Sequence, residues 1–261
     1  MKCADIIEKL EALSPATYAE DWDNIGLLAG RRDKEVKTIY VAVDATDEVI
    51  EDAIEMKADM LLTHHPLIFK KMSRVTTDDF IGRRIYRLIR NDISYYAMHT
   101  NFDIMGMADA AADEIKLQNR QVLDVTYEDD IAKEGIGRFG ELPHIMTLEE
   151  CGAYIKNVFD LESVKIFGQP EAIIQTAAIV PGSGGSCIAD ALALDSDVLI
   201  TGDIDHHEGI DAVAQGLAII DAGHYGIEKI FIPYMQEFLK REVPGINVQG
   251  AEFKNPFYVL T

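Results

Sequence analysis

Six of the seven histidines in this chain lie in short segments, and only His144 stands apart. The segments are Thr63-His64-His65-Pro66, His99 to Asp103, His206-His207, and His224 to Glu228. Neutral imidazole together with carboxylate is a ligand set that suits Zn, Fe, Mn or Ni. The grouping therefore predicts a metal site, with two ions rather than one.

His64 and His65 follow an apolar stretch, residues 58–63, that is typical of a buried strand. In open α/β sheets, ligands bind beyond the carboxyl ends of the strands. Adjacent residues of a strand point to opposite faces, so two neighbouring histidines suit two neighbouring ions better than one. The alternative is a solvated strand end without a ligand.

Two carboxylates complete the predicted ligand set. Asp103 follows His99, where a carboxylate could bridge two cations, although it could instead cap the following helix. Glu228 stands four residues after His224, and on a helix that spacing puts both side chains on one face, ~5–6 Å apart at Cβ. A plain surface pair is the alternative for these two.

Two further histidines are candidates for moving protons in catalysis: His99 and His207. His207 and its neighbour His206 follow Thr201-Gly202-Asp203 at an expected strand end. For His206, a surface position at a helix start is an equally good interpretation.

The elements that must position these residues alternate along the chain. Strands are expected at residues 38–43, 58–63, 93–98, 172–180, 197–201 and 217–221. Helices are expected near the start of the chain, at 47–56 and 79–90, and from about Met107, Thr147 and His224. This alternation predicts a parallel α/β architecture.

Residues 53–63 resemble residues 191–201: both run from a helix end through an Asp and a strand to a Thr. The repeat predicts two related lobes. We expect these to be three-layer α/β lobes, with the dinuclear metal site in the cleft. We place the lobes at residues 1–126 and 127–261, with an approximate boundary near the acidic stretch Glu128-Asp129-Asp130. A return of the chain to the first lobe is left open.

Composition excludes several function classes. The net charge of −21 disfavours direct contact with nucleic acid or with anionic membrane surfaces. No apolar run approaches the ~18 residues of a membrane span, and the N-terminus does not read as a signal peptide. The three cysteines are distant and odd in number, so we expect no disulfide framework and a cytoplasmic location.

Three smaller features have open interpretations. Gly182-Ser183-Gly184-Gly185 could cradle an anion, although a tight strand-to-helix turn is the favoured reading. Cys187 could be reactive, or a small packed residue. Trp22, the only tryptophan, is interpreted as a structural anchor.

Four motifs, in order along the chain, resemble the NIF-three-like family. They are Trp22 to Leu27, Thr63 to Phe69, His99 to Asp103 and Asp221 to Glu228, and Gly135-Ile136-Gly137-Arg138 and Gly182 to Gly185 fit as well. Bacterial members are often labelled GTP cyclohydrolase I type 2 homologues. The chain is similar to the short form of the family, which lacks an inserted domain.

The resemblance implies two α/β lobes and two divalent metal ions per chain. By position, the ligands would be His64, His65, Asp103, His224 and Glu228, with Asp103 bridging. It also implies a toroidal homo-hexamer with the metal sites facing an internal cavity.

The leading hypothesis is a metal-dependent hydrolase that acts on a small-molecule substrate such as a nucleotide, with Zn, Fe or Mn as the metal. Opening of the GTP imidazole ring is the reaction that the family label suggests. The alternative is a non-enzymatic protein that binds, stores or delivers metal, or an interaction scaffold. A transcription-associated role would need a partner protein, because the charge opposes DNA contact.

Overall fold

The computed structural model describes residues 1–260 and divides the chain into two compact units. Unit 1 comprises Met1–Phe102 and Phe231–Phe253, and unit 2 comprises Asp103–Ile230 with the residues from Lys254 onward. The chain leaves unit 1 earlier than the expected boundary at residue 126. The acidic stretch is the turn of a hairpin, where Asp129 accepts hydrogen bonds from the backbone of Ile131 and Ala132.

Unit 1 is built on a five-stranded sheet in the order β1-β4-β3-β2-β11. Its strands are β1 (Gly26–Ala29), β2 (Thr38–Ala42), β3 (Met60–Thr63), β4 (Ser94–Ala97) and β11 (Asn247–Gly250). All neighbouring strands are parallel except β1, which pairs antiparallel with β4. The carboxyl ends of β2, β3 and β4 therefore meet at one edge of the sheet.

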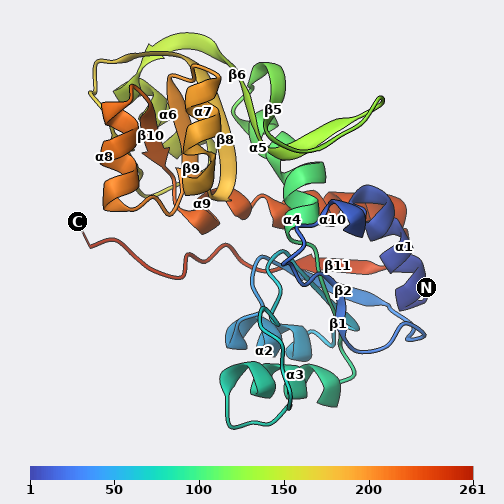
Figure 1. Cartoon of the computed structure of the whole chain (residues 1–261). Coiled ribbons are helices and arrows are strands. Elements are labelled where there is room, and N and C mark those ends of the chain that lie inside the picture. The colour runs from blue at the N-terminus through green and yellow to red at the C-terminus, as the bar shows by residue number, and fades with distance from the viewer. Residues whose placement is uncertain (261) are drawn as a thin grey trace. The chain divides into compact units, whose positions relative to one another are not determined.

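Helices cover both faces of this sheet (Figure 1). They are α1 (Cys3–Leu13), α2 (Asp47–Glu55), α3 (Phe80–Arg90) and α10 (Phe231–Glu242), with a short α4 (Thr100–Phe102) and a 3-10 turn (Ala16–Tyr18). On one face, Tyr40, Leu61 and Tyr95 of the strands pack against Ile50 of α2 and Leu88 of α3. α1 and α10 lie on the other face (Figure 1).

Unit 2 is built on a six-stranded sheet in the order β5-β6-β8-β9-β10-β7. Its strands are β5 (Gln118–Glu128), β6 (Lys133–Thr147), β7 (Lys165–Phe167), β8 (Ile173–Ser183), β9 (Val198–Gly202) and β10 (Ala218–Asp221). β8, β9 and β10 are parallel, and the remaining pairings are antiparallel.

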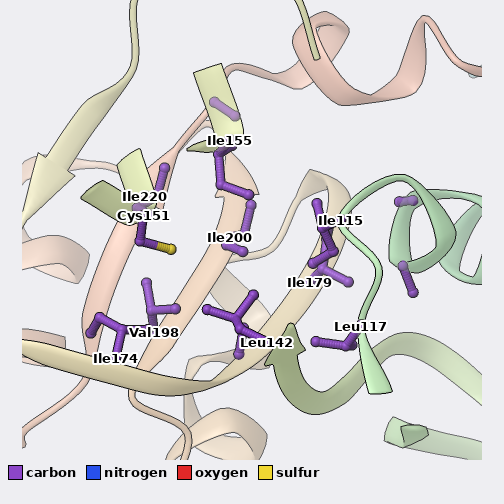
Figure 2. Packing of buried hydrophobic residues seen from close by; sticks show 14 of the residues in the cluster. Ile115, Leu117, Leu142, Cys151, Ile155, Ile174, Ile179, Val198, Ile200 and Ile220 are labelled. Carbon is purple, nitrogen blue, oxygen red and sulfur yellow. The ribbon is translucent and has the colours of Figure 1, made fainter. Parts of the chain in front are cut away.

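Two apolar layers cover the sheet of unit 2. Its helices are α5 (Ala108–Glu114), α6 (Leu148–Val158), α7 (Ile188–Ala193), α8 (His206–Ala214) and α9 (His224–Glu228), with a π-helix (Asp103–Met107) and a 3-10 turn (Gly185–Cys187). On one face, Ile179 and Ile200 pack against Ile115 and against Ile155 of α6 (Figure 2). On the other face, the α7 and α8 helices cover the sheet.

The two units repeat one topology, as the sequence repeat predicted. β1-β2-α2-β3-α3-β4 corresponds to β7-β8-α7-β9-α8-β10, with an antiparallel first strand beside the last strand in both. The repeated aspartates have the same role. Asp59 Oδ2 accepts hydrogen bonds from the backbone of Lys37 and Thr38, and Asp197 Oδ2 accepts them from Gln175 and Thr176.

No helix in the described part of the chain, residues 1–260, has the length and hydrophobicity that crossing a membrane requires.

Candidate metal centre

Unit 1 brings three histidines together beyond the carboxyl ends of its strands. His64 and His65 follow β3 directly, and His99 comes two residues after β4. One ring nitrogen of each lies within 4.8 Å of the others. Ring centroids are 4.8 Å apart for His64 and His65, and 5.3 and 5.4 Å from these two to His99. This packing provides a compact set of nitrogen donors.

Each of these histidines has its Nδ1 held by an oxygen. His64 Nδ1 lies 2.8 Å from the carbonyl oxygen of Met98, and His65 Nδ1 lies 2.9 Å from Oδ1 of Asp44. A carbonyl oxygen only accepts, so His64 Nδ1 carries the proton and a neutral ring keeps its lone pair on Nε2. Histidines that bind metals almost always donate their other ring N–H in this way.

His99 is held by Asp23. Its Nδ1 lies 2.9 Å from Oδ1 of the aspartate, whose Oδ2 accepts hydrogen bonds from the backbone and hydroxyl of Thr100. Burial raises the pKa of Asp23, but the hydrogen bonds from His99 and Thr100 outweigh it and lower the pKa to about 2. The carboxylate is therefore ionised at neutral pH and fixes the orientation of the His99 ring.

In unit 2, the expected helical pair forms on α9. His224 Nδ1 lies 2.8 Å from Oδ2 of Asp203, and its Nε2 lies 3.2 Å from Oε2 of Glu228, which is only 3% exposed. A neutral imidazole can donate to only one of these two carboxylates. The second contact needs either another proton or a cation, and Nε2 and Oε2 together suit one metal ion.

Glycines in unit 2 make room for this pair. A Cβ at Gly182 would collide with Oε1 of Glu228, and a Cβ at Gly202 would collide with the backbone nitrogen of His224. Gly182 also has a positive φ of 75°. The glycine-rich segment therefore has a packing role at the ends of β8 and β9.

Asp103 begins the π-helix Asp103–Met107. One of its carboxylate oxygens lies within 4.8 Å of one of Glu228. The preceding residues Thr100–Phe102 are already helical, so the alternative that Asp103 caps the start of a helix is wrong. Single π-helical turns are frequent at functional sites.

Comparison with known proteins identifies the family. The sequence profile of the Duf34/NIF3 (NGG1p interacting factor 3) family matches residues 1–256. The chain belongs to this family.

Relatives in the Duf34/NIF3 family cover the whole chain. A Clostridium perfringens protein named "GTP cyclohydrolase 1 type 2 homolog" is 38% identical over 98% of this chain and 99% of its own. A Bacillus subtilis protein of the same name is 26% identical over 369 residues, 98% of each chain, so it carries residues that this shorter chain lacks. The structure of a Staphylococcus aureus hypothetical protein is similar, with a TM-score of 0.90 and 31% identity over 100% of this chain and 99% of that one.

The structure does not group all the sequence candidates of this Duf34/NIF3 chain. His206 and His207 are exposed in the first turn of α8, which Asp205 caps through hydrogen bonds from the backbone of His207 and Glu208. Within residues 1–260, neither belongs to a cluster of three or more donor side chains. A catalytic role for His207 stays a prediction.

Sequence reasoning missed the three aspartates that orient the histidines: Asp23, Asp44 and Asp203. For two of them, position in the sequence could have identified them as site residues. Asp44 and Asp203 follow the carboxyl ends of β2 and β9, the same position in the fold that singled out His64. Asp23 lies 76 residues from its partner His99, and no spacing rule connects them.

The structure decides between the interpretations of two other residues, Cys187 and Trp22. Cys187 is buried in the core of unit 2, and burial raises the pKa of its thiol to about 11, which fits a packed rather than a reactive cysteine. The interpretation of Trp22 as a structural anchor is wrong, because its side chain is 59% exposed. A buried anchor would have lost nearly all of that surface.

Proposed function

We propose that this protein binds two divalent metal ions per chain, which His64, His65, Asp103, His224 and Glu228 would hold. We propose further that it uses them to hydrolyse a nucleotide or a related small molecule. The observation that carries the proposal is the common orientation of the histidines: oxygen acceptors hold the Nδ1 atoms of His64, His65 and His224. That arrangement is typical of metal ligands.

The donor types favour Zn, Fe or Mn. Imidazole suits Zn and Fe, carboxylate suits Mn, and this set contains no thiolate that would select a softer metal. Glu228 adds support, because its buried carboxylate lies 3.2 Å from Nε2 of His224, so an oxygen donor and a nitrogen donor stand side by side.

When bound, divalent ions would lower the pKa of water towards ~7 and would stabilise negative charge on the attacked group. His99 is the proposed proton carrier, since ionised Asp23 fixes its ring and would stabilise the imidazolium after proton uptake. His207 is proposed as a second proton carrier. The name of the relatives supports a nucleotide substrate, with GTP as the first to test.

The function is tested by GTP turnover in His99→Gln. With wild-type protein loaded with Zn, Mn or Fe, we expect GTP consumption in liquid chromatography, and His99→Gln should lower the rate by about 10²–10⁴-fold with metal content unchanged. Metal content that falls with His99→Gln would show that His99 is a ligand instead. Bound metal without turnover of any nucleotide would favour the alternative of metal storage or delivery.

A second prediction concerns the orientation of His224. Asp203→Ala removes the acceptor of its Nδ1, so the ring can rotate or change tautomer, and we expect metal affinity about 10–100-fold weaker. Isothermal titration of metal-free protein with Zn²⁺ measures this. Asp211→Ala, on the exposed part of α8, is the matched control. Equal affinities for both variants would show that Asp203 does not support a ligand.

We also propose the homo-hexamer that the family resemblance implies. Light scattering would then give six times the chain mass of 29.0 kDa.

A further inference from the structure

Unit 1 carries an exposed aromatic pair beside its histidine cluster. Trp22 is 59% exposed and Phe69 is 54% exposed, and their rings stack with centroids 6.1 Å apart and an interplanar angle of 24°. Both meet the ring of His99 edge-on, at 5.9 and 5.7 Å. Large aromatic side chains left open to solvent beside a polar cluster are typical of a binding surface.

The backbone under both rings is fixed. Asn24 Nδ2 donates a hydrogen bond of 2.6 Å to the carbonyl oxygen of Ile68, which joins the segment of Trp22 to the segment of Phe69. Asp23, next to Trp22, is tied to His99 and Thr100. Aromatic side chains have only two χ angles, so a platform on a fixed backbone loses little entropy when it binds a ligand.

Basic side chains follow Phe69, the second member of this aromatic pair, along the sequence. Lys70 and Lys71 directly follow Phe69 and are exposed, as is Arg74, and residues 66–75 contain no acidic side chain. This segment is unusual in a chain whose net charge is −21. Lysine and arginine side chains are the common partners of phosphate groups.

We propose that Trp22 and Phe69 stack on the planar heteroaromatic ring of the ligand, and that Lys70 and Lys71 contact its phosphate. The ligand class is therefore a nucleotide, with its base against the aromatic pair beside His99. The inference rests on the proposed function, because it assigns the recognition of the substrate to these four residues. Stacking on aromatic side chains is sequence-tolerant, since every base has a π-face, so adenine and guanine nucleotides both fit.

The single tryptophan of the chain gives a direct reporter. Tryptophan fluorescence of metal-loaded protein is titrated with guanosine monophosphate, guanosine and ribose 5-phosphate. We expect saturable quenching by guanosine monophosphate, weaker binding of guanosine, and no quenching by ribose 5-phosphate. No quenching by guanosine or adenosine monophosphate would overturn the inference.

Variants separate the ring contact from the phosphate contact. Phe69→Ala, and Trp22→Ala measured by calorimetry, should bind guanosine monophosphate about tenfold more weakly. Lys70→Ala combined with Lys71→Ala should weaken binding of guanosine monophosphate but not of guanosine. Tyr86→Ala, an exposed aromatic on α3, is the control and should bind as the wild type does.

Metal content distinguishes the two proposals. All of these variants should keep the metal content of the wild type, because none removes a proposed ligand. Full metal content with unchanged nucleotide affinity in Phe69→Ala and Trp22→Ala overturns the aromatic platform and leaves the metal proposal intact. Absence of metal from the wild type overturns the proposed function itself.

Discussion

Glu228→Gln is expected to lose at least one of the two metal ions and to lower any metal-dependent turnover by more than about 10²-fold. Glu228 is buried and lies 3.2 Å from His224 Nε2, so the neutral amide removes both a ligand and the charge that would balance a cation. Metal that binds only the folded protein raises its Tm, so we expect the rise in Tm that added metal causes to disappear in this variant.

The measurement is metal content together with thermal unfolding, with and without added Zn²⁺. Glu149→Gln is the matched control, since Glu149 is an exposed carboxylate in the first turn of α6. A Glu228→Gln protein that retains full metal content would show that Glu228 is buried for a structural reason.

Gly182→Ala is expected to weaken metal binding by about 10–100-fold, although it changes no ligand. The added methyl group would collide with Oε1 of Glu228, so the carboxylate must shift from its position beside His224 Nε2. The substitution also places a side chain at φ 75°, which costs about 1–2 kcal/mol of folding stability.

Gly216→Ala isolates the second effect. Gly216 has a φ of 98°, but a Cβ there would meet no atom within 4 Å. Both variants should lose similar stability in urea unfolding, and only Gly182→Ala should lose metal affinity in titrations with Zn²⁺. Equal metal affinities for the two variants would contradict the role of Gly182 in placing Glu228.

The buried parallel strands were predictable from sequence. The expected strands at residues 38–43, 58–63 and 93–98 match β2, β3 and β4 to within two residues at each end. Strands covered on both faces read as continuous apolar runs, which is a strong local signal. The histidines were singled out for the same reason, because they stand where those runs end.

Elements with weaker local signals were missed. β5 and β6 form a long hairpin, yet β5 mixes charged, polar and apolar residues and is mostly exposed, so no apolar run marks it. α10 contains Pro233, and proline normally breaks a helix. Here it lies in the first turn, where the backbone N–H groups have no partner within the helix, so a missing N–H costs no hydrogen bond. β11 lies far from β2 in the sequence but pairs parallel with it in the sheet of unit 1. Spacing along the sequence does not predict this pairing.

The residues of the site also differ in how far the sequence predicts them. Residue type and spacing identified His224 with Glu228, because four residues on a helix fix their proximity. The partners that orient the histidines depend on tertiary contacts, such as Asp23 with His99 across 76 residues. The exposure of Trp22 likewise depends on how its loop packs, and residue type alone predicted the opposite.

Metal content of the purified protein, measured by elemental analysis on the wild type, His224→Ala and His144→Ala, tests the central claim most directly. His144 lies exposed on β6 and serves as the control histidine. We expect about two divalent ions per chain in the wild type and in His144→Ala, and fewer in His224→Ala. No metal in any of the three, even after reconstitution with Zn, Fe or Mn, would contradict the account and leave the histidine clusters with a structural role.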